Sequence, residues 1–127
     1  MLVGTRFWAA TEAHVPVAAQ RRILTAEGDE TTRTSVYDII RDRAWPEGFR
    51  GRVMRNALVD RWHGREYSLH ERRDEVFLAY TDALSEEDFD LANVTVGEAI
   101  GQITEIRPAA ELVTRAEEVL NARAVRA

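Results

Sequence analysis

The chain has no cysteine, and all 17 of its basic side chains are arginine, so lysine is absent as well. Without cysteine the 127 residues can form no disulfide framework, thiolate metal site or cysteine nucleophile. Without lysine they can form neither a Schiff base nor a P-loop phosphate contact. Long apolar runs are also missing, since none approaches the ~20 residues that a membrane helix needs. We therefore expect no membrane-spanning segment.

Charge of one sign is not concentrated anywhere along the chain. The net charge is −5, and arginines alternate with acidic residues, which leaves no basic face for a nucleic-acid backbone. A hydrophobic fraction of 45% and a charged fraction of 31% are typical of a soluble globular protein of one domain. The first residues carry no basic leader, and Arg6 interrupts them, so they do not read as a secretory signal. A cytoplasmic location is the resulting expectation.

The spacing of apolar residues predicts a mainly helical α+β chain. Two aromatic residues, Trp45 and Phe49, are expected to anchor a loop at 42–51, and Ser85 is expected to cap a short helix. The final helix, which opens at Pro108, should bury Leu112 and the apolar residues that follow it. The predicted helices cover about 14–26, 67–84, 86–91 and 108–122, and the predicted strands cover 1–3, 31–40 and 52–57.

Gly4-Thr5 is the first candidate for a binding site. An apolar strand that runs into a Gly-Thr turn can present backbone N–H groups to a phosphate, because glycine has no Cβ to block a close approach. Two residues are a weak motif, and an ordinary turn at the end of a strand is the preferred interpretation when they are taken alone.

Other polar groups are weaker candidates. Histidines lack zinc-site spacing, although His63, Glu66 and His70 leave a metal site along one helix face as an alternative. For the carboxylates, capping and solvation are preferred to acid–base roles, and for the arginines a pair with Asp60 is preferred to an anion site. For the tryptophans, core or loop anchoring is preferred to flavin stacking. The groups concerned are His14; Asp38, Asp42, Glu86, Glu87, Asp88 and Asp90; Arg52, Arg55 and Asn56; and Trp8, Trp45 and Trp62.

Six short segments form an ordered series over nearly the whole chain: residues 4–7, 10–12, 31–38, 51–57, 97–101 and 106–113. In order and spacing they resemble blocks in the C-terminal third of the nitronate monooxygenases, the flavoenzymes similar to 2-nitropropane dioxygenase. In that family a long flavin-binding barrel precedes the first block, whereas three residues precede it here. The resemblance implies that the chain is the C-terminal portion of such a protein.

The resemblance implies a fold and a cofactor site. Residues 1–12 would be the last strand and phosphate turn of an FMN-binding (β/α)8 TIM barrel, residues 13–96 a smaller α+β domain with a short antiparallel sheet, and residues 97–127 the return to the barrel and its final helix. Val3, Gly4 and Thr5 would contact the FMN phosphate, as loops after the last barrel strands often do. The family's catalytic histidine matches none of the three histidines, so no catalytic residue is assigned.

The resemblance also implies a reaction, the FMN-dependent oxidation of alkyl nitronates by dioxygen. A barrel with one strand cannot close, so we expect the chain to be inactive alone and to need the missing barrel portion or a homo-oligomeric partner. The alternative is a non-catalytic α+β interaction module derived from that family. Binding of FMN would separate the two hypotheses.

Overall fold

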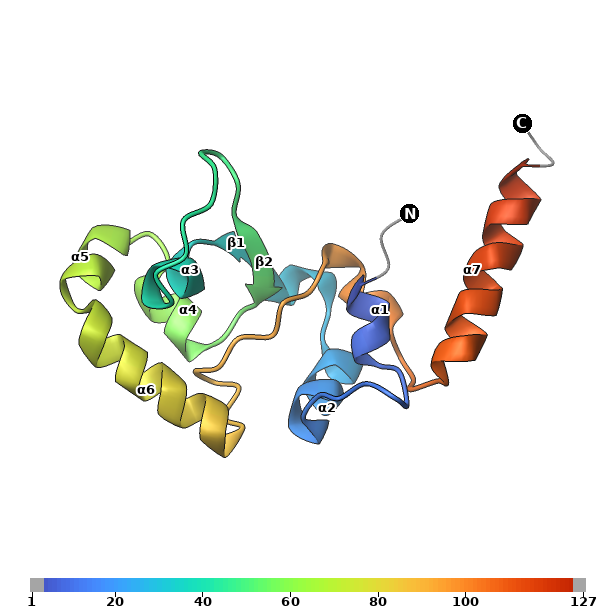
Figure 1. The fold of residues 1–127 in the computed structure, drawn as a ribbon, viewed down its shortest axis with the longest axis horizontal. Helices are drawn as coiled ribbons and strands as arrows, with labels where there is room; N and C mark the ends of the chain where they lie inside the picture. Colours follow the sequence, from blue (N-terminus) through green and yellow to red (C-terminus); the bar gives the residue numbers. More distant parts are fainter. Residues whose placement is uncertain (1–3, 125–127) are drawn as a thin grey trace.

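The computed structural model describes residues 4–124, which form a mainly helical chain with one small sheet (Figure 1). This confirms the expected mainly helical composition and the short antiparallel sheet. Among the described residues, no helix is both long and apolar enough to cross a bilayer. The α-helices are α1 (Gly4–Trp8), α2 (Val17–Thr25), α3 (Val36–Ile40), α4 (Ala57–Trp62), α5 (Glu66–Glu71), α6 (Arg73–Glu86) and α7 (Ala109–Ala124); the 3-10 helices are η1 (Gly28–Glu30) and η2 (Glu98–Gln102); and the strands are β1 (Thr31–Thr34) and β2 (Gly51–Met54).

The sheet joins distant parts of the sequence. Strand β1 pairs antiparallel with β2, with Thr31 opposite Met54. The other edge of β2 holds the segment that follows α6, because the Met54 N–H donates to the Val94 carbonyl at 2.9 Å and the Val96 N–H donates to the Arg52 carbonyl at 3.1 Å. The backbone of β2 is therefore hydrogen-bonded on both sides.

Two hydrophobic clusters flank β2. Neighbouring side chains of a strand point to opposite faces, so Val53 enters the first cluster and Met54 the second. The first cluster is built on α3 to α6, and the second on α2, η2 and the chain after α1. The first contains Val36, Tyr37, Ile40, Val53, Leu58, Val59, Trp62, Leu69, Val76 and Tyr80; the second contains Ala9, Ala19, Ile23, Ala26, Met54, Val94, Val96, Ile100 and Ile103.

The strand predicted for 31–40 is wrong beyond Thr34. Strand β1 ends there, and Val36–Ile40 forms α3 despite its β-branched residues. Val36, Tyr37 and Ile40 then lie in the first cluster, where the helical turn places them together. Burial in the core has overridden the local β-propensity.

The helix predicted for 67–84 is divided. Arg72, with φ −110° and ψ 15°, separates α5 from α6. The helix predicted at 86–91 is also wrong, because Ser85 lies in the last turn of α6, where its hydroxyl donates to the Thr81 carbonyl at 3.1 Å. Glu87, in the left-handed region at φ 56°, then ends α6. The acidic run therefore closes one helix and does not open another.

Helix α7 starts directly after Pro108, as predicted, and leans away from the rest of the chain (Figure 1). Its first turn is bound by a residue that is far away in the sequence, because the Ala109 N–H donates to Glu12 Oε2 at 2.8 Å. Of the predicted apolar face only Leu112 is buried, whereas Val119 and Leu120 are 48% and 50% exposed. The packing of this face onto a barrel remains a prediction.

The contact between η1 and η2 leaves no room for a side chain at Gly28. A Cβ built there would lie 2.9 Å from the backbone carbonyl oxygen of Glu98. We expect Gly28→Ala to lower the free energy of unfolding by ~1–3 kcal/mol, because a backbone carbonyl cannot move aside cheaply. Chemical denaturation measures the change. Gly51→Ala is the matched control, since its Cβ would meet nothing within 4 Å; equal stability of both variants with the parent would contradict the expectation.

Candidate functional site

The predicted phosphate turn lies at the start of α1. Val3 and the strand predicted for 1–3 lie outside the described residues, and the segment after them is a helix rather than a turn. Gly4 begins this helix and Thr5 follows. A Cβ built on Gly4 would meet nothing within 4 Å, so the space beside its backbone is open to a ligand.

Thr5 ties α1 to η2. Its Oγ1 accepts a hydrogen bond from the Gly97 N–H at 2.7 Å, across 92 residues of sequence. Because a hydroxyl both accepts and donates, the proton of Thr5 remains available to a second acceptor. The same two elements border a cavity of about 370 Å³, lined by Thr5, Arg6, Gly97, Glu98, Ala99, Gln102 and Ile103.

A curated protein is similar in sequence to most of this chain. No protein-family model matches the chain. A nitronate monooxygenase from Neurospora crassa is 29% identical over 121 residues, which are 93% of this chain and 31% of that enzyme. The chain is similar to a nitronate monooxygenase. It spans about a third of the length of this curated relative.

Solved structures support the fold. The structure of FabK from Thermotoga maritima matches 95% of this chain with a TM-score of 0.67 and 22% identity, and 38% of FabK is covered. A point mutant of the same FabK gives a TM-score of 0.60 with 20% identity, covering 96% of this chain and 35% of the mutant. At these identities the likeness concerns the fold alone.

The geometry around α1 fits the phosphate end of the FMN that the nitronate monooxygenase resemblance implies. The open side of Gly4 permits close approach of an anion to the backbone, and the Thr5 hydroxyl has a proton to donate.

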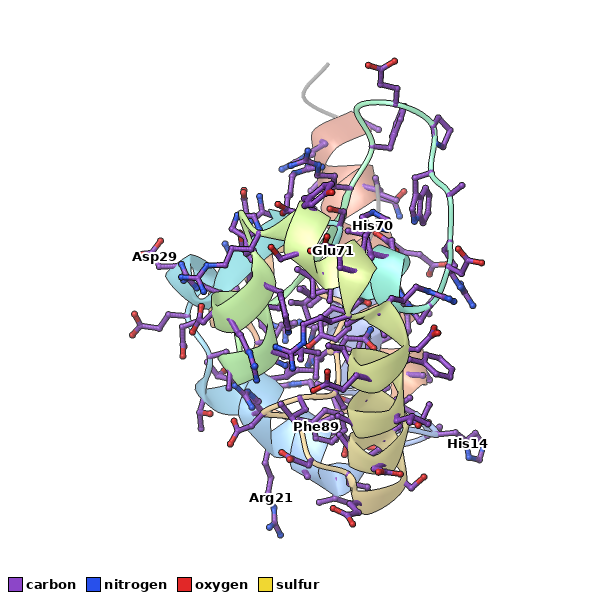
Figure 2. The ribbon with its side chains drawn as sticks, turned by 90° about the vertical axis from the view of Figure 1, so that its left-hand side faces the viewer. His14, Arg21, Asp29, His70, Glu71 and Phe89 are labelled. Atoms are coloured by element: carbon purple, nitrogen blue, oxygen red, sulfur yellow. The ribbon has the colours of Figure 1, made fainter. Side chains whose placement is uncertain are left out.

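The histidines do not form a metal or catalytic cluster. His14 is exposed and points outward (Figure 2). His63 Nδ1 lies 3.2 Å from Thr34 Oγ1 and 4.0 Å from Glu66. His70 is exposed beneath the 41–50 loop. Across residues 4–124 no three histidine or acidic side chains gather as metal ligands, so the alternative site that combined His63 with His70 is not formed.

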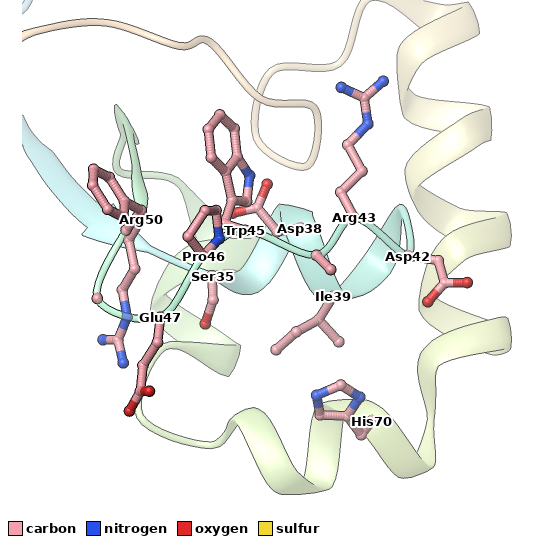
Figure 3. A pocket seen from close by; sticks show the side chains of 13 residues that line it. Ser35, Asp38, Ile39, Asp42, Arg43, Trp45, Pro46, Glu47, Arg50 and His70 are labelled. Carbon is pink, nitrogen blue, oxygen red and sulfur yellow. The ribbon is translucent and has the colours of Figure 1, made fainter.

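The 41–50 loop borders a hollow that His70 also lines, and its aromatic residues are not anchors. Trp45 is 57% exposed and Phe49 is 67% exposed, which contradicts the prediction that they tie the loop down. Figure 3 shows the imidazole of His70 facing Ile39 beneath this loop, with the carboxylate of Asp42 turned toward α6. No charged side chains converge there on a common point.

The predicted polar group of Arg52, Arg55 and Asn56 is structural. Arg55 pairs with Asp60 at 2.7 Å, as predicted, and Arg52 pairs with Glu98 at 2.5 Å. Two of the candidate carboxylates likewise pair with arginines: Asp38 lies 3.4 Å from Arg41, and Asp90 lies 3.1 Å from Arg22.

Asn56 organises the polar part of the first cluster. Its Oδ1 accepts from the Val59 N–H at 3.0 Å and caps α4, and its Nδ2 donates to the carbonyls of Phe89 and Ala92 at 3.1 and 2.9 Å. Tyr37 Oη lies 2.7 Å from Nδ2 and donates to the Leu91 carbonyl at 2.9 Å. Burial raises the pKa of Tyr37 well above its ordinary value, so the phenol stays protonated and keeps this role.

Sequence reasoning missed Gly97 and Arg6 as neighbours of the site. Gly97 opens one of the six segments of the resemblance, but nothing local indicates that its N–H donates to Thr5. Arg6 immediately follows the Gly-Thr pair and lines the cavity. An arginine directly after a phosphate motif is the signal that could have drawn attention to it.

Proposed function

We propose that this chain supplies the phosphate end of the cofactor site and the smaller α+β domain of an FMN-dependent nitronate monooxygenase. The match of 121 residues to the Neurospora crassa enzyme is the observation that supports it most directly. Residues 1–12 and 97–127 are proposed as the parts that meet the barrel, and 13–96 as the smaller domain. The substrates would be an alkyl nitronate and dioxygen.

Within this proposal the chain's residues bind and orient the cofactor. Val3, Gly4 and Thr5 hold the phosphate, the backbone through its N–H groups and Thr5 through its hydroxyl. Bound flavin supplies the redox chemistry. We assign no catalytic residue to this chain, and we propose that the reacting end of the flavin and the catalytic histidine are held by a barrel from further residues or another chain.

The experiment is a comparison of FMN with riboflavin, which lacks the phosphate. Purified chain should bind FMN more tightly than riboflavin, and Thr5→Val should reduce that preference because it removes the hydroxyl. Thr5→Ser should retain it, and Thr114→Val, on α7, is the matched control for loss of an exposed threonine hydroxyl. Isothermal calorimetry measures each affinity. Equal affinity for FMN and riboflavin would contradict the proposal.

Turnover is measured separately, as nitrite released from an alkyl nitronate. We expect none from the chain with FMN alone, because we assign no catalytic residue to it. Nitrite release at a rate proportional to the concentration of the chain would refute the proposed need for a barrel.

The second candidate is an interaction module without flavin chemistry. It is favoured by the two hydrophobic clusters, which bury residues such as Ile23, Leu69 and Ile100 completely within the described residues. A chain that unfolds cooperatively and binds neither FMN nor riboflavin would support this candidate over the first.

A further inference from the structure

Arg6 has an unusual environment for a partly buried cation. Its Nη1 donates to the Ala9 carbonyl at 3.3 Å, and no carboxylate within residues 4–124 lies close enough to form an ion pair with it. Burial lowers the pKa of Arg6, which is the direction expected when a charge lacks a compensating partner. An arginine without a counter-charge is expected to bind an added anion.

The surrounding charges do not neutralise Arg6. Glu105 attracts it, but this carboxylate is already bound by Arg107 Nε at 2.6 Å. The other ionic partner of Arg107 is Glu111, at 3.2 Å. Arg115 also repels Arg6 and has no ion pair of its own in the described part of the chain. Around Arg6 the arginines thus outnumber the glutamates by three to two, although the net charge of the whole protein is −5.

The cavity between α1 and η2 places other hydrogen-bond donors beside Arg6. Thr5 and Gln102 line it with a hydroxyl proton and a side-chain amide, and Ala99 and Ile103 leave the rest apolar. Glu98 is the acidic residue of the lining, and its carboxylate is held by Arg52 at 2.5 Å. The donors that remain free in the lining thus match an acceptor-only ligand.

We propose that this cavity binds a phosphate-type oxyanion, with Arg6 as its ionic partner and Thr5 and Gln102 as hydrogen-bond donors. This assigns Arg6 and Gln102 a binding role beyond the three residues that the resemblance implies. The anion has two possible sources, free phosphate and the phosphate of FMN. Assigning it to FMN rests on the proposed function; binding of the anion at Arg6 does not.

The test uses inorganic phosphate as the probe, followed by amide chemical shifts in the 127-residue chain. Phosphate should shift the amides of α1 and η2, and Arg6→Gln should weaken binding by about tenfold or more, because a charge-assisted contact is lost. Arg21→Gln is the matched control, since Arg21 is exposed on α2 and points outward (Figure 2). Arg6→Lys keeps the charge and should bind more tightly than Arg6→Gln.

The outcomes separate this inference from the proposed function. Loss of phosphate binding in Arg6→Gln, together with displacement of phosphate by FMN but not by riboflavin, would support both. The same loss without displacement by FMN would support the anion site and count against FMN as its ligand. Phosphate affinity that is unmeasurable in the parent, or unchanged in Arg6→Gln with unaltered thermal stability, would overturn the inference. Should Arg6→Gln not fold, Arg6→Met replaces it, and a phosphate affinity equal to that of the parent in both Arg6→Met and Gln102→Leu would overturn the inference as well.

Discussion

Asn56→Ala is expected to lower the free energy of unfolding by ~3–5 kcal/mol, because it removes a helix cap and leaves two backbone groups, an N–H and a carbonyl, without partners. The Val59 N–H loses its acceptor and the Ala92 carbonyl loses its donor, whereas the Phe89 carbonyl keeps only the hydrogen bond from Arg22 at 2.7 Å. Both carbonyls belong to the segment after α6, so that segment should loosen first. Urea denaturation measures the free energy, and amide exchange locates the loosened segment.

Asn121→Ala is the matched control for this substitution. Asn121 is exposed on α7, where alanine is a good helix former, so the change in stability should stay within ~0.5 kcal/mol. A loss below ~1 kcal/mol in Asn56→Ala would show that other groups or water replace its hydrogen bonds.

Trp62→Ala is expected to cost ~3–5 kcal/mol, whereas Trp45→Ala should change stability by no more than ~0.5 kcal/mol. Trp62 is 5% exposed within the first cluster, and the guanidinium carbons of Arg61 and Arg72 lie 5.1 and 5.9 Å from its ring centroid. Trp45 is largely solvated on its loop. The variants remove the same side chain, so the difference between them isolates burial.

Chemical denaturation of both variants is the measurement, and Trp62→Phe should recover part of the loss. Comparable losses at the two positions would mean that the 41–50 loop packs in solution, which would restore the anchoring role predicted for Trp45. The fluorescence emission spectrum of Trp45→Ala should also lack the contribution of a solvated indole.

Local signals predicted the elements that depend on local chemistry. Helix α2 follows from its apolar spacing, α7 from Pro108, and β2 from the residues around Val53. The pair between Arg55 and Asp60 was also predictable, because the two residues are close in sequence and opposite in charge. In each case the decisive interaction spans few residues.

The errors arise where distant contacts decide the structure. The segment from Val36 to Ile40 has a strand-like composition. As a helix, however, it places Val36, Tyr37 and Ile40 together in the first cluster. Ser85 resembles an N-cap until α6 is seen to continue through it. Trp45 has the chemistry of an anchor, yet no cluster lies within its reach.

The candidate site shows the same division. Gly4 and Thr5 were identified by resemblance, and their contact with a phosphate stays a prediction. The partner of Thr5 is 92 residues away, and the cavity exists only because α1 and η2 meet. No pattern in the first twelve residues carries that information.

Strand β2 is too short to contribute much stability by its own hydrogen bonds. Its position between the two hydrophobic clusters, however, lets it affect the packing of both. Val53 and Met54 are consecutive, and each belongs to a different hydrophobic cluster. A slip of β2 by one residue would exchange the two side chains between the clusters and leave both badly filled. Because the register of four residues fills both clusters at once, we expect the two halves of the chain to unfold together.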